Sequence, residues 1–242
     1  EDDCTVDSVN GFDYLGEAYV EADPDYTGRV TVPVLWDTET DTIVNNESIE
    51  IMETLATEMR EVGNGADLYP ADIREEVDAV VDAIYDPINN GVYRAGFAGT
   101  QEAYETAVTE LFDALGHWDD VLADQRYLAA DGERLTLADL RMFATLVRFD
   151  QVYHTHFKCN RRLISQYDNL WPYVRDVYTT PGIAETVNMA HIKEHYYTTH
   201  TDINPTAFVA AGPDLDFEAD HDRDELPGGP PAELVAGAAS AD

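Results

Sequence analysis

Short apolar runs mark the first part of the chain. Residues 29–36, "RVTVPVLW", and residues 42–45, "TIVN", are separated by the polar sequence "DTETD". Apolar runs bounded by turn residues are typical of β-strands, so this stretch predicts two strands joined by a tight turn. Pro33 interrupts the first run. Because proline has no N–H for the strand ladder, it must lie at an edge, a bulge or a turn.

The segments before and after the two predicted strands have the apolar spacing of helices. Apolar residues recur at helical spacing before Pro24 and again over residues 47–62. From Pro70 onward the same spacing predicts longer helices over residues 70–84, 101–124, 136–150, 169–179 and 181–199. Thr136 and Asp139 have the spacing of a capping box, in which each side chain bonds a backbone amide of the first turn.

The change of pattern divides the chain into three parts. Residues 1–65 form a small mixed part and residues 66–205 an all-helical domain, so the predicted fold class is α+β. Residues 206–242 are an acidic tail, expected to be partly disordered because it is poor in core-forming residues. An isolated hairpin is marginally stable in water, and residue 1 is Glu rather than Met. We therefore expect a fragment or a processed chain that lacks an upstream part.

The balance of charge is strongly acidic. The 242 residues contain 49 Asp and Glu against 14 Lys and Arg, a formal net charge of -35, and only Lys158 and Lys193 are lysines. The carboxylates are spread along every predicted helix, which favours adaptation to high salt, where like-charge repulsion is screened. An acidic surface that binds a basic partner would concentrate its carboxylates in one patch. Nucleic-acid binding is not expected, because no basic stripe exists to contact phosphates.

Neither a membrane span nor a metal site is expected. No run of about 18 apolar residues could span a bilayer, which predicts a soluble protein. Cys4 and Cys159 match no metal or redox spacing, which favours a reducing cytoplasm. His191 and His195 are four residues apart, as metal ligands on a helix are, but Ile192 stands where a zinc-protease motif has Glu. We assign the two histidines to hydrogen bonding or packing.

Sequence blocks between Val9 and about Pro213 resemble those of a known family. They are "GRVTVPVLWD", "IVNNES", "IYDPINNGVYRAGFA", "HFKCN", "NLWPYVRDVY", "PGIAETVNMAHIKEHYY" and "INPT". These blocks are similar to the signature blocks of the xi-class glutathione transferases, the glutathionyl-hydroquinone reductases. The resemblance implies the second half of a thioredoxin-like domain, followed by the all-α C-terminal domain of a glutathione transferase. It also implies a homodimer when the protein is full length.

The resemblance assigns thiol binding to four residues of the first part. In thioredoxin-like folds the proline matching Pro33 forms a cis peptide, and the N–H and C=O of the preceding residue, here Val32, pair with the cysteinyl part of the thiol. Residues matching Glu47 and Ser48 bind the γ-glutamyl end: Ser and backbone N–H groups hold the carboxylate, and Glu meets the ammonium. A helix N-terminus favours an anion on physical grounds as well. The alternative is that Asn46 or Ser48 merely caps a helix.

The resemblance places the second substrate against tyrosines of the helical domain. Tyr93 and Tyr196 are the candidates that would hydrogen-bond a hydroquinone or quinone oxygen, with Tyr197 as the alternative if the alignment is shifted by one residue. A phenol donates to a developing phenolate, which release of a hydroquinone requires. The alternative for each tyrosine is a place at the edge of the core.

The implied activity is thiol-dependent reduction of glutathionyl or γ-glutamylcysteinyl hydroquinone conjugates, with glutathione or γ-glutamylcysteine as co-substrate. The family's nucleophile is a cysteine in a Cys-Pro-Trp-Ala segment, which does not occur in this sequence. We expect it upstream of residue 1, so the chain alone is expected to be inactive. Cys4 lacks a recognisable helix start, and Cys159 is interpreted as a packed residue. The alternative is a non-catalytic thiol-peptide binding protein or scaffold that has lost the cysteine half.

Overall fold

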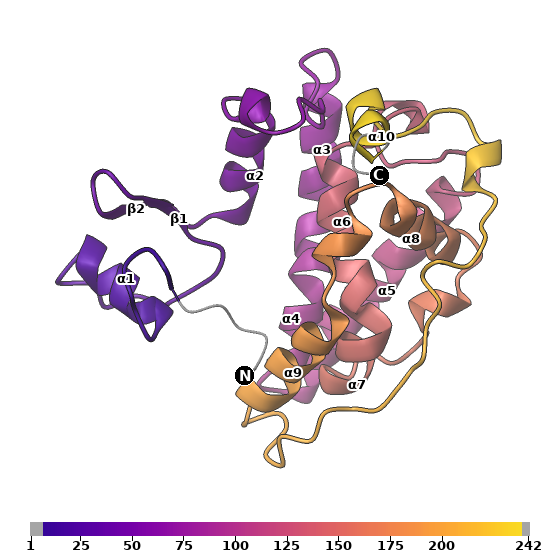
Figure 1. The fold of residues 1–242 in the computed structure, drawn as a ribbon. Coiled ribbons are helices and arrows are strands. Elements are labelled where there is room, and N and C mark those ends of the chain that lie inside the picture. Colours follow the sequence, from indigo (N-terminus) through magenta and orange to yellow (C-terminus); the bar gives the residue numbers. More distant parts are fainter. Residues whose placement is uncertain (1–6, 239–242) are drawn as a thin grey trace. The chain divides into compact units, whose positions relative to one another are not determined.

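The chain folds into two compact units. A computed structural model describes residues 7–238, and the chain divides after Glu61 into residues 1–61 and residues 62–242. The first unit contains a two-stranded sheet with helices α1 and α2, and the second unit is helical (Figure 1). This is the predicted α+β fold class.

The strands of the first unit form an antiparallel hairpin. β1 (Leu35–Asp37) pairs with β2 (Thr42–Asn45). The Asp37 carboxylate stabilises the turn, because it accepts hydrogen bonds from the backbone N–H of Glu39 at 2.8 Å and from the hydroxyl of Thr40 at 2.6 Å. The predicted hairpin is confirmed.

β1 is shorter than the sequence pattern predicts. It begins at Leu35 instead of Arg29. Since Pro33 has no N–H to donate, the ladder does not extend through it. A side chain holds the preceding residues instead: the hydroxyl of Tyr19 donates to the carbonyl of Thr31 at 2.9 Å.

The helices of the first unit are α1 (Leu15–Ala22) and α2 (Ser48–Ala56), followed by the short 3-10 turn η1 (Arg60–Val62). α2 ends earlier than the predicted boundary near Val62. Thr57 closes its last turn, because both its N–H and its hydroxyl donate to the carbonyl of Glu53, at 2.9 and 2.7 Å. A threonine hydroxyl that bonds the carbonyl of the preceding turn offers the backbone an alternative to helical hydrogen bonding, which disfavours continuation of the helix.

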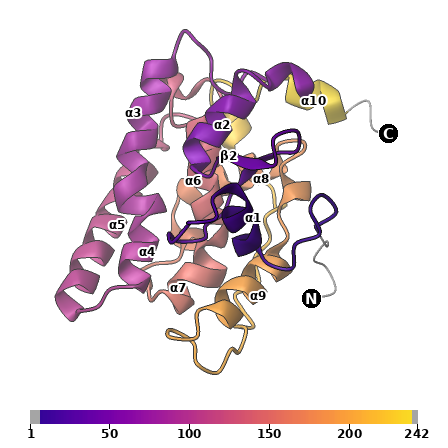
Figure 2. The same ribbon diagram turned by 90° about the vertical axis from the view of Figure 1, so that its left-hand side faces the viewer.

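The second unit is a bundle of helices. Its longer helices are α3 (Arg74–Ile84), α5 (Gln101–Val121), α6 (Leu137–Arg148), α8 (Leu170–Thr179) and α9 (Met189–Thr199), and its shorter helices are α4 (Gly91–Gly96), α7 (His154–His156) and α10 (Ala232–Ala238). α4 packs on α5 and α3 packs on α6 (Figure 2). The core between them is apolar and includes the fully buried Leu111, Leu115, Met142 and Phe149. Within the described residues no helix is both long and apolar enough to cross a membrane.

Two π-helical turns interrupt this bundle. η2 (Tyr85–Asn89) connects α3 to α4, and η4 (Phe149–Tyr153) connects α6 to α7. A π-turn adds a residue to the helical repeat and so rotates the following side chains around the axis. Helical periodicity alone therefore misplaces the residues that follow these turns.

Local capping decides where α6 and α9 begin. The predicted capping box of α6 is present, with the N–H of Thr136 donating to the Asp139 carboxylate at 2.8 Å. α9 begins later than the predicted residue 181. The side chain of Asn188 caps it by accepting from the N–H of His191 at 3.0 Å, and Gly182 has a φ of +87° in the turn before it.

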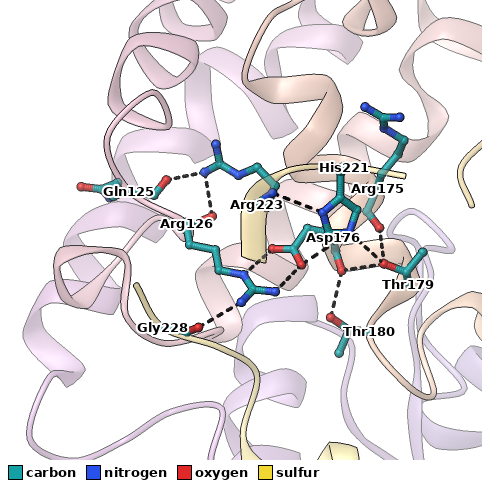
Figure 3. Close-up of polar contacts among 9 residues, drawn as sticks. All are labelled: Gln125, Arg126, Arg175, Asp176, Thr179, Thr180, His221, Arg223 and Gly228. Carbon is teal, nitrogen blue, oxygen red and sulfur yellow. Dashed lines mark hydrogen bonds and ion pairs between the residues drawn. The ribbon is translucent and has the colours of Figure 1, made fainter. Parts of the chain in front are cut away.

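Within the described residues, part of the predicted acidic tail packs on the helical unit, while residues 239–242 of that tail lie outside the described residues. Arg223 is 3% exposed, and its guanidinium donates to the carbonyl of Leu122 at 2.6 Å, at the end of α5. It also donates to the carbonyl of Arg126 at 3.1 Å. Figure 3 shows the same guanidinium beside Gln125 and Arg126. Carbonyls at a helix C-terminus have no partner within the helix, and the five donors of an arginine satisfy them.

Asp176 of α8 joins the same network. Its carboxylate accepts two hydrogen bonds from Arg126, at 2.7 and 2.8 Å, and lies 3.8 Å from Nε2 of His221 (Figure 3). Arg126 also donates to the carbonyl of Gly228 at 3.0 Å. The hydrogen bonds that Arg126 donates to the Asp176 carboxylate raise the pKa of Arg126. His221 of the C-terminal segment thus lies against α8, and Gly228 is joined to α8 through Arg126.

Candidate functional site

The loop before β1 lies beside the start of α2. Asn46 donates from its side-chain amide to the hydroxyl of Thr31 at 3.0 Å, and the hydroxyl of Tyr19 donates to the carbonyl of Thr31. The peptide bond between Val32 and Pro33 is cis, as the family resemblance implies. Val32 is 76% exposed, and within the described residues no backbone hydrogen bond uses its N–H or C=O. Both groups are therefore free to pair with an extended ligand.

The first turn of α2 presents unpaired N–H groups. Glu47 is the N-cap residue, and no side chain caps the helix, so the alternative that Asn46 or Ser48 acts as the cap is wrong. Asn45 instead accepts from the N–H of Glu47 at 2.7 Å. Within residues 7–238 no hydrogen bond is donated by the N–H groups of Ser48, Ile49 or Glu50. Unpaired amides at the positive end of a helix dipole favour a carboxylate.

These predicted residues form an open surface, which we call the cradle: Val32, Pro33, Glu47 and Ser48, all exposed. A cavity of about 430 Å³ in the same unit lies elsewhere, and its lining includes Phe12, Tyr14 and Leu15 together with Val34, Trp36 and Thr38. None of the cradle residues lines it. A thiol peptide at the cradle would therefore bind to backbone and helix-end groups on the surface of this unit.

Three tyrosine hydroxyls meet in the helical unit. Tyr93 lies on α4, Tyr196 on α9, and Tyr153 is the last residue of η4. The hydroxyl of Tyr153 lies 2.9 Å from that of Tyr196 and 3.5 Å from that of Tyr93, and the hydroxyls of Tyr93 and Tyr196 are also hydrogen-bonded. We call Tyr93, Tyr153 and Tyr196 the tyrosine cluster. The structure thus brings the two predicted tyrosines together.

Tyr197 does not belong to the tyrosine cluster. Its hydroxyl donates to the carbonyl of Gln151 at 3.1 Å. The alternative alignment that would use Tyr197 in place of Tyr196 is therefore not supported by this geometry.

Tyr153 is the residue that sequence reasoning missed. It is 2% exposed and follows α6 through the π-turn η4. Regular helical spacing predicts only that Tyr153 is a buried aromatic residue of the core. It lies at the end of the π-turn, where side chains depart from regular α-helical spacing, and its hydroxyl lies 2.9 Å from that of Tyr196.

Burial keeps two members of the tyrosine cluster, Tyr153 and Tyr196, protonated. It raises the pKa of Tyr153 well above its ordinary value, and the neighbouring Tyr196 and Tyr93 raise it further. Burial also raises the pKa of Tyr196, with Tyr93 contributing in the same direction. At neutral pH Tyr153 and Tyr196 therefore carry protons that can be donated to an oxygen atom of a ligand.

Two histidines stack beside the tyrosine cluster. Nε2 of His156 lies 3.1 Å from Nδ1 of His200, and the two rings are stacked with centroids 5.3 Å apart. Burial lowers the pKa of His156 to about 4, and it also lowers the pKa of His200. Both imidazoles are therefore neutral at neutral pH, which allows one ring to donate and the other to accept.

The described residues offer neither a cysteine nucleophile nor a metal site. Cys159 is fully buried, and burial raises its pKa to about 12, so it carries no thiolate at neutral pH. Cys4 lies outside the described residues. His195 packs its ring against Tyr196, and no group of three or more His, Cys, Asp or Glu in residues 7–238 could hold a metal ion.

Sequence comparisons identify the family. The model of the glutathione S-transferase C-terminal domain matches residues 101–176. The glutathionyl-hydroquinone reductase YqjG of Escherichia coli (strain K12) is 48% identical over 222 residues, which cover 91% of this chain and 67% of that protein. The chain belongs to the xi-class glutathione transferases, the glutathionyl-hydroquinone reductases.

Solved structures agree with this assignment. The chain resembles the xi-class transferase from Natrialba magadii with a TM-score of 0.91 at 66% identity, over 95% of this chain and 71% of the other. It resembles the glutathione-bound structure of YqjG from Escherichia coli K-12 with a TM-score of 0.87 at 48% identity, over 91% of this chain and 72% of the other. The chain therefore spans about two thirds to three quarters of the length of each of these relatives.

Proposed function

We propose that the protein reduces glutathionyl hydroquinone conjugates with a thiol co-substrate. The observation that carries the proposal is the tyrosine cluster, in which the hydroxyls of Tyr93, Tyr153 and Tyr196 meet at one place. The relative from Escherichia coli is a glutathionyl-hydroquinone reductase, which supports the same chemistry here.

The proposed reaction proceeds in two exchanges at sulfur. A cysteine thiolate attacks the sulfur of the conjugate, so that an S–S bond forms as the bond from sulfur to the aromatic ring breaks. The electron pair of the broken bond passes to the ring, which takes up a proton and leaves as hydroquinone. A second glutathione thiolate then attacks the mixed disulfide, releasing glutathione disulfide and the cysteine thiolate. Tyrosine hydroxyls hydrogen-bond the ring oxygen on which negative charge develops.

The cradle holds the thiol peptide in this proposal. The carboxylate of the γ-glutamyl end accepts from the free amides at the start of α2 and from the hydroxyl of Ser48, while the Glu47 carboxylate meets the ammonium. The N–H and C=O of Val32 pair with the cysteinyl residue. Glutathione and γ-glutamylcysteine share this end, so either thiol fits. The glutathione-bound structure of a relative supports glutathione.

We place the nucleophilic cysteine outside the 242 residues, because Cys159 is buried with a raised pKa. The same proposal includes two further points. The full-length protein forms a homodimer, and it acts in a cytoplasm of high salt concentration. Carboxylates on the exposed face of α3 support the salt requirement, since Glu75, Glu76 and Asp78 are all exposed. The absence of a nucleophile from the described residues favours a second candidate, a thiol-peptide binding protein without catalytic activity.

Steady-state kinetics of the protein extended to include the cysteine test the proposal. In buffer with molar KCl, we expect a glutathionyl hydroquinone to yield free hydroquinone and one glutathione disulfide per turnover. Replacement of the cysteine by serine should reduce turnover by at least about 1,000-fold, because the covalent route is lost. Turnover that survives this replacement would refute the nucleophile. Glutathione binding without turnover in the unmodified extended protein would support the non-catalytic candidate.

A further inference from the structure

A single aromatic ring lies against every member of the tyrosine cluster. Phe157 follows α7 and is fully buried. Its ring centroid lies 5.4 Å from that of Tyr93, 5.5 Å from that of Tyr153 and 5.9 Å from that of Tyr196. The ring stacks on Tyr153 and meets the other two edge to face, which are favourable aromatic geometries. Any shift of Phe157 therefore moves all three tyrosines.

Gly96 lets α4 approach Phe157 closely. It lies three residues after Tyr93, one turn along the same helix. A Cβ atom at position 96 would stand 2.3 Å from Cγ and 2.8 Å from Cβ of Phe157. These two atoms lie next to the backbone, so rotation of the ring cannot relieve the collision. Only glycine permits the present distance between α4 and Phe157.

We propose that Gly96 and Phe157 are positioning residues, which set the separation of the three hydroxyls in the tyrosine cluster. The proposal rests on the proposed function only where it concerns catalysis. Gly96 sets the distance between α4, which carries Tyr93, and Phe157. The ring of Phe157 packs against the rings of all three tyrosines. Because a misplacement of about 1 Å in a reacting group can cost about 100-fold in rate, this spacing governs the step in which hydroquinone leaves. Thiol binding at the cradle involves other residues and is unaffected.

The test compares two glycine substitutions in helices. Alanine is the better helix former, so Gly116→Ala in α5, where an added Cβ meets no atom within 4 Å, should raise the midpoint of thermal unfolding by about 2 °C. Gly96→Ala, at the last residue of α4, should instead lower the midpoint, because α4 must move away from Phe157. Equal shifts for the two variants would overturn the steric part of the inference.

Fluorine NMR of protein labelled with 3-fluorotyrosine reads the tyrosine cluster directly. Tyr→Phe substitutions assign the resonances of Tyr93, Tyr153 and Tyr196. Gly96→Ala should shift these three resonances while Gly116→Ala leaves them in place. Phe157→Leu, which keeps an apolar side chain but removes the ring, serves as a second route to the same displacement if Gly96→Ala does not fold. Unmoved resonances in the folded variants would overturn the inference.

Kinetics of the cysteine-containing protein complete the test. Gly96→Ala should lower kcat for a glutathionyl hydroquinone by about 10- to 100-fold while KM for glutathione changes by less than about 2-fold. An unchanged kcat together with shifted resonances would overturn the role in catalysis. If the wild type shows no turnover but the resonances shift as expected, the proposed function fails and the positioning of the tyrosine cluster stands.

Discussion

Replacing Tyr196 by phenylalanine is expected to slow release of hydroquinone about 100-fold, the usual cost of removing one donor to a developing oxyanion. The hydroxyl of Tyr196 makes the two closer contacts of the tyrosine cluster, to Tyr93 and to Tyr153. Without it, only the 3.5 Å contact between the hydroxyls of Tyr93 and Tyr153 remains. The kcat for a glutathionyl hydroquinone, measured in the cysteine-containing protein, reports the loss.

Tyr197→Phe is the matched control for this substitution. Tyr197 is the next residue on α9 and is also buried, but its hydroxyl donates to the carbonyl of Gln151. Its removal should change kcat by less than about 3-fold, since that bond lies outside the tyrosine cluster. Equal losses in the two variants would mean that α9 matters only as a structural support, which would contradict the role of the hydroxyl.

Replacing Asp139 by alanine should lower the free energy of unfolding of the protein by about 3 kcal/mol, since it removes a helix cap and leaves buried donors unpaired. One oxygen of this fully buried carboxylate accepts from the N–H of Leu128 at 2.9 Å and from the hydroxyl of Tyr173 at 3.0 Å. The other accepts from the N–H of Thr136 at 2.8 Å and from its hydroxyl at 3.0 Å. Denaturant unfolding in molar KCl measures the change.

Asp113→Ala is the control for the loss of a carboxylate. Asp113 lies exposed on α5, so its removal should change the free energy of unfolding by less than about 0.5 kcal/mol. A loss of similar size in both variants would indicate that net charge, and not the capping box, determines the effect.

The same carboxyl gives a pH signature. Burial raises the pKa of Asp139 to about 6, although hydrogen bonds from Leu128, Thr136 and Tyr173 oppose this rise. The folded state thus binds a proton more tightly than the unfolded state, where the pKa has its ordinary value near 3.8. Its stabilising contribution is fully present below about pH 4 and falls as the pH rises to about 6. Asp139→Asn should remove this slope from the pH dependence of unfolding.

Local signals predicted much of the fold where a single turn or cap decides the structure. The hairpin after Pro33 and the capping box of Thr136 depend on residues a few positions apart, so both are readable from sequence. The predicted helix boundaries were wrong where a side-chain hydrogen bond to the backbone ends or starts the helix. Thr57 ends α2 and Asn188 delays α9, and these residue types are also common where helices continue or turns form.

Long-range contacts could not be predicted in the same way. The composition of the C-terminal segment is typical of disorder, yet one buried arginine, Arg223, anchors it to carbonyls about 100 residues earlier in the chain. Composition averages over such single residues. Tyr153 was missed for a related reason, because the π-turn that orients it has no reliable sequence signature.

The candidate site was predictable in part. The helix start near Ser48 follows from a short motif, and the cis peptide before Pro33 was implied by the family resemblance. The hydrogen bond from Asn46 to Thr31 that brings them together joins residues 15 positions apart. Tyr93 and Tyr196 came from the resemblance alone, since they lie 103 residues apart and no spacing rule links them.

Calorimetric titration of the 242-residue chain with glutathione in molar KCl tests the cradle most directly. We expect saturable binding of one glutathione per chain. Ser48→Ala should raise the Kd by about 10-fold, because it removes a hydrogen bond to a charged carboxylate. Ser165→Ala, in the helical unit, should leave the Kd unchanged. Absence of saturable binding, or binding that is indifferent to Ser48, would contradict the assignment of a γ-glutamyl thiol site to the start of α2.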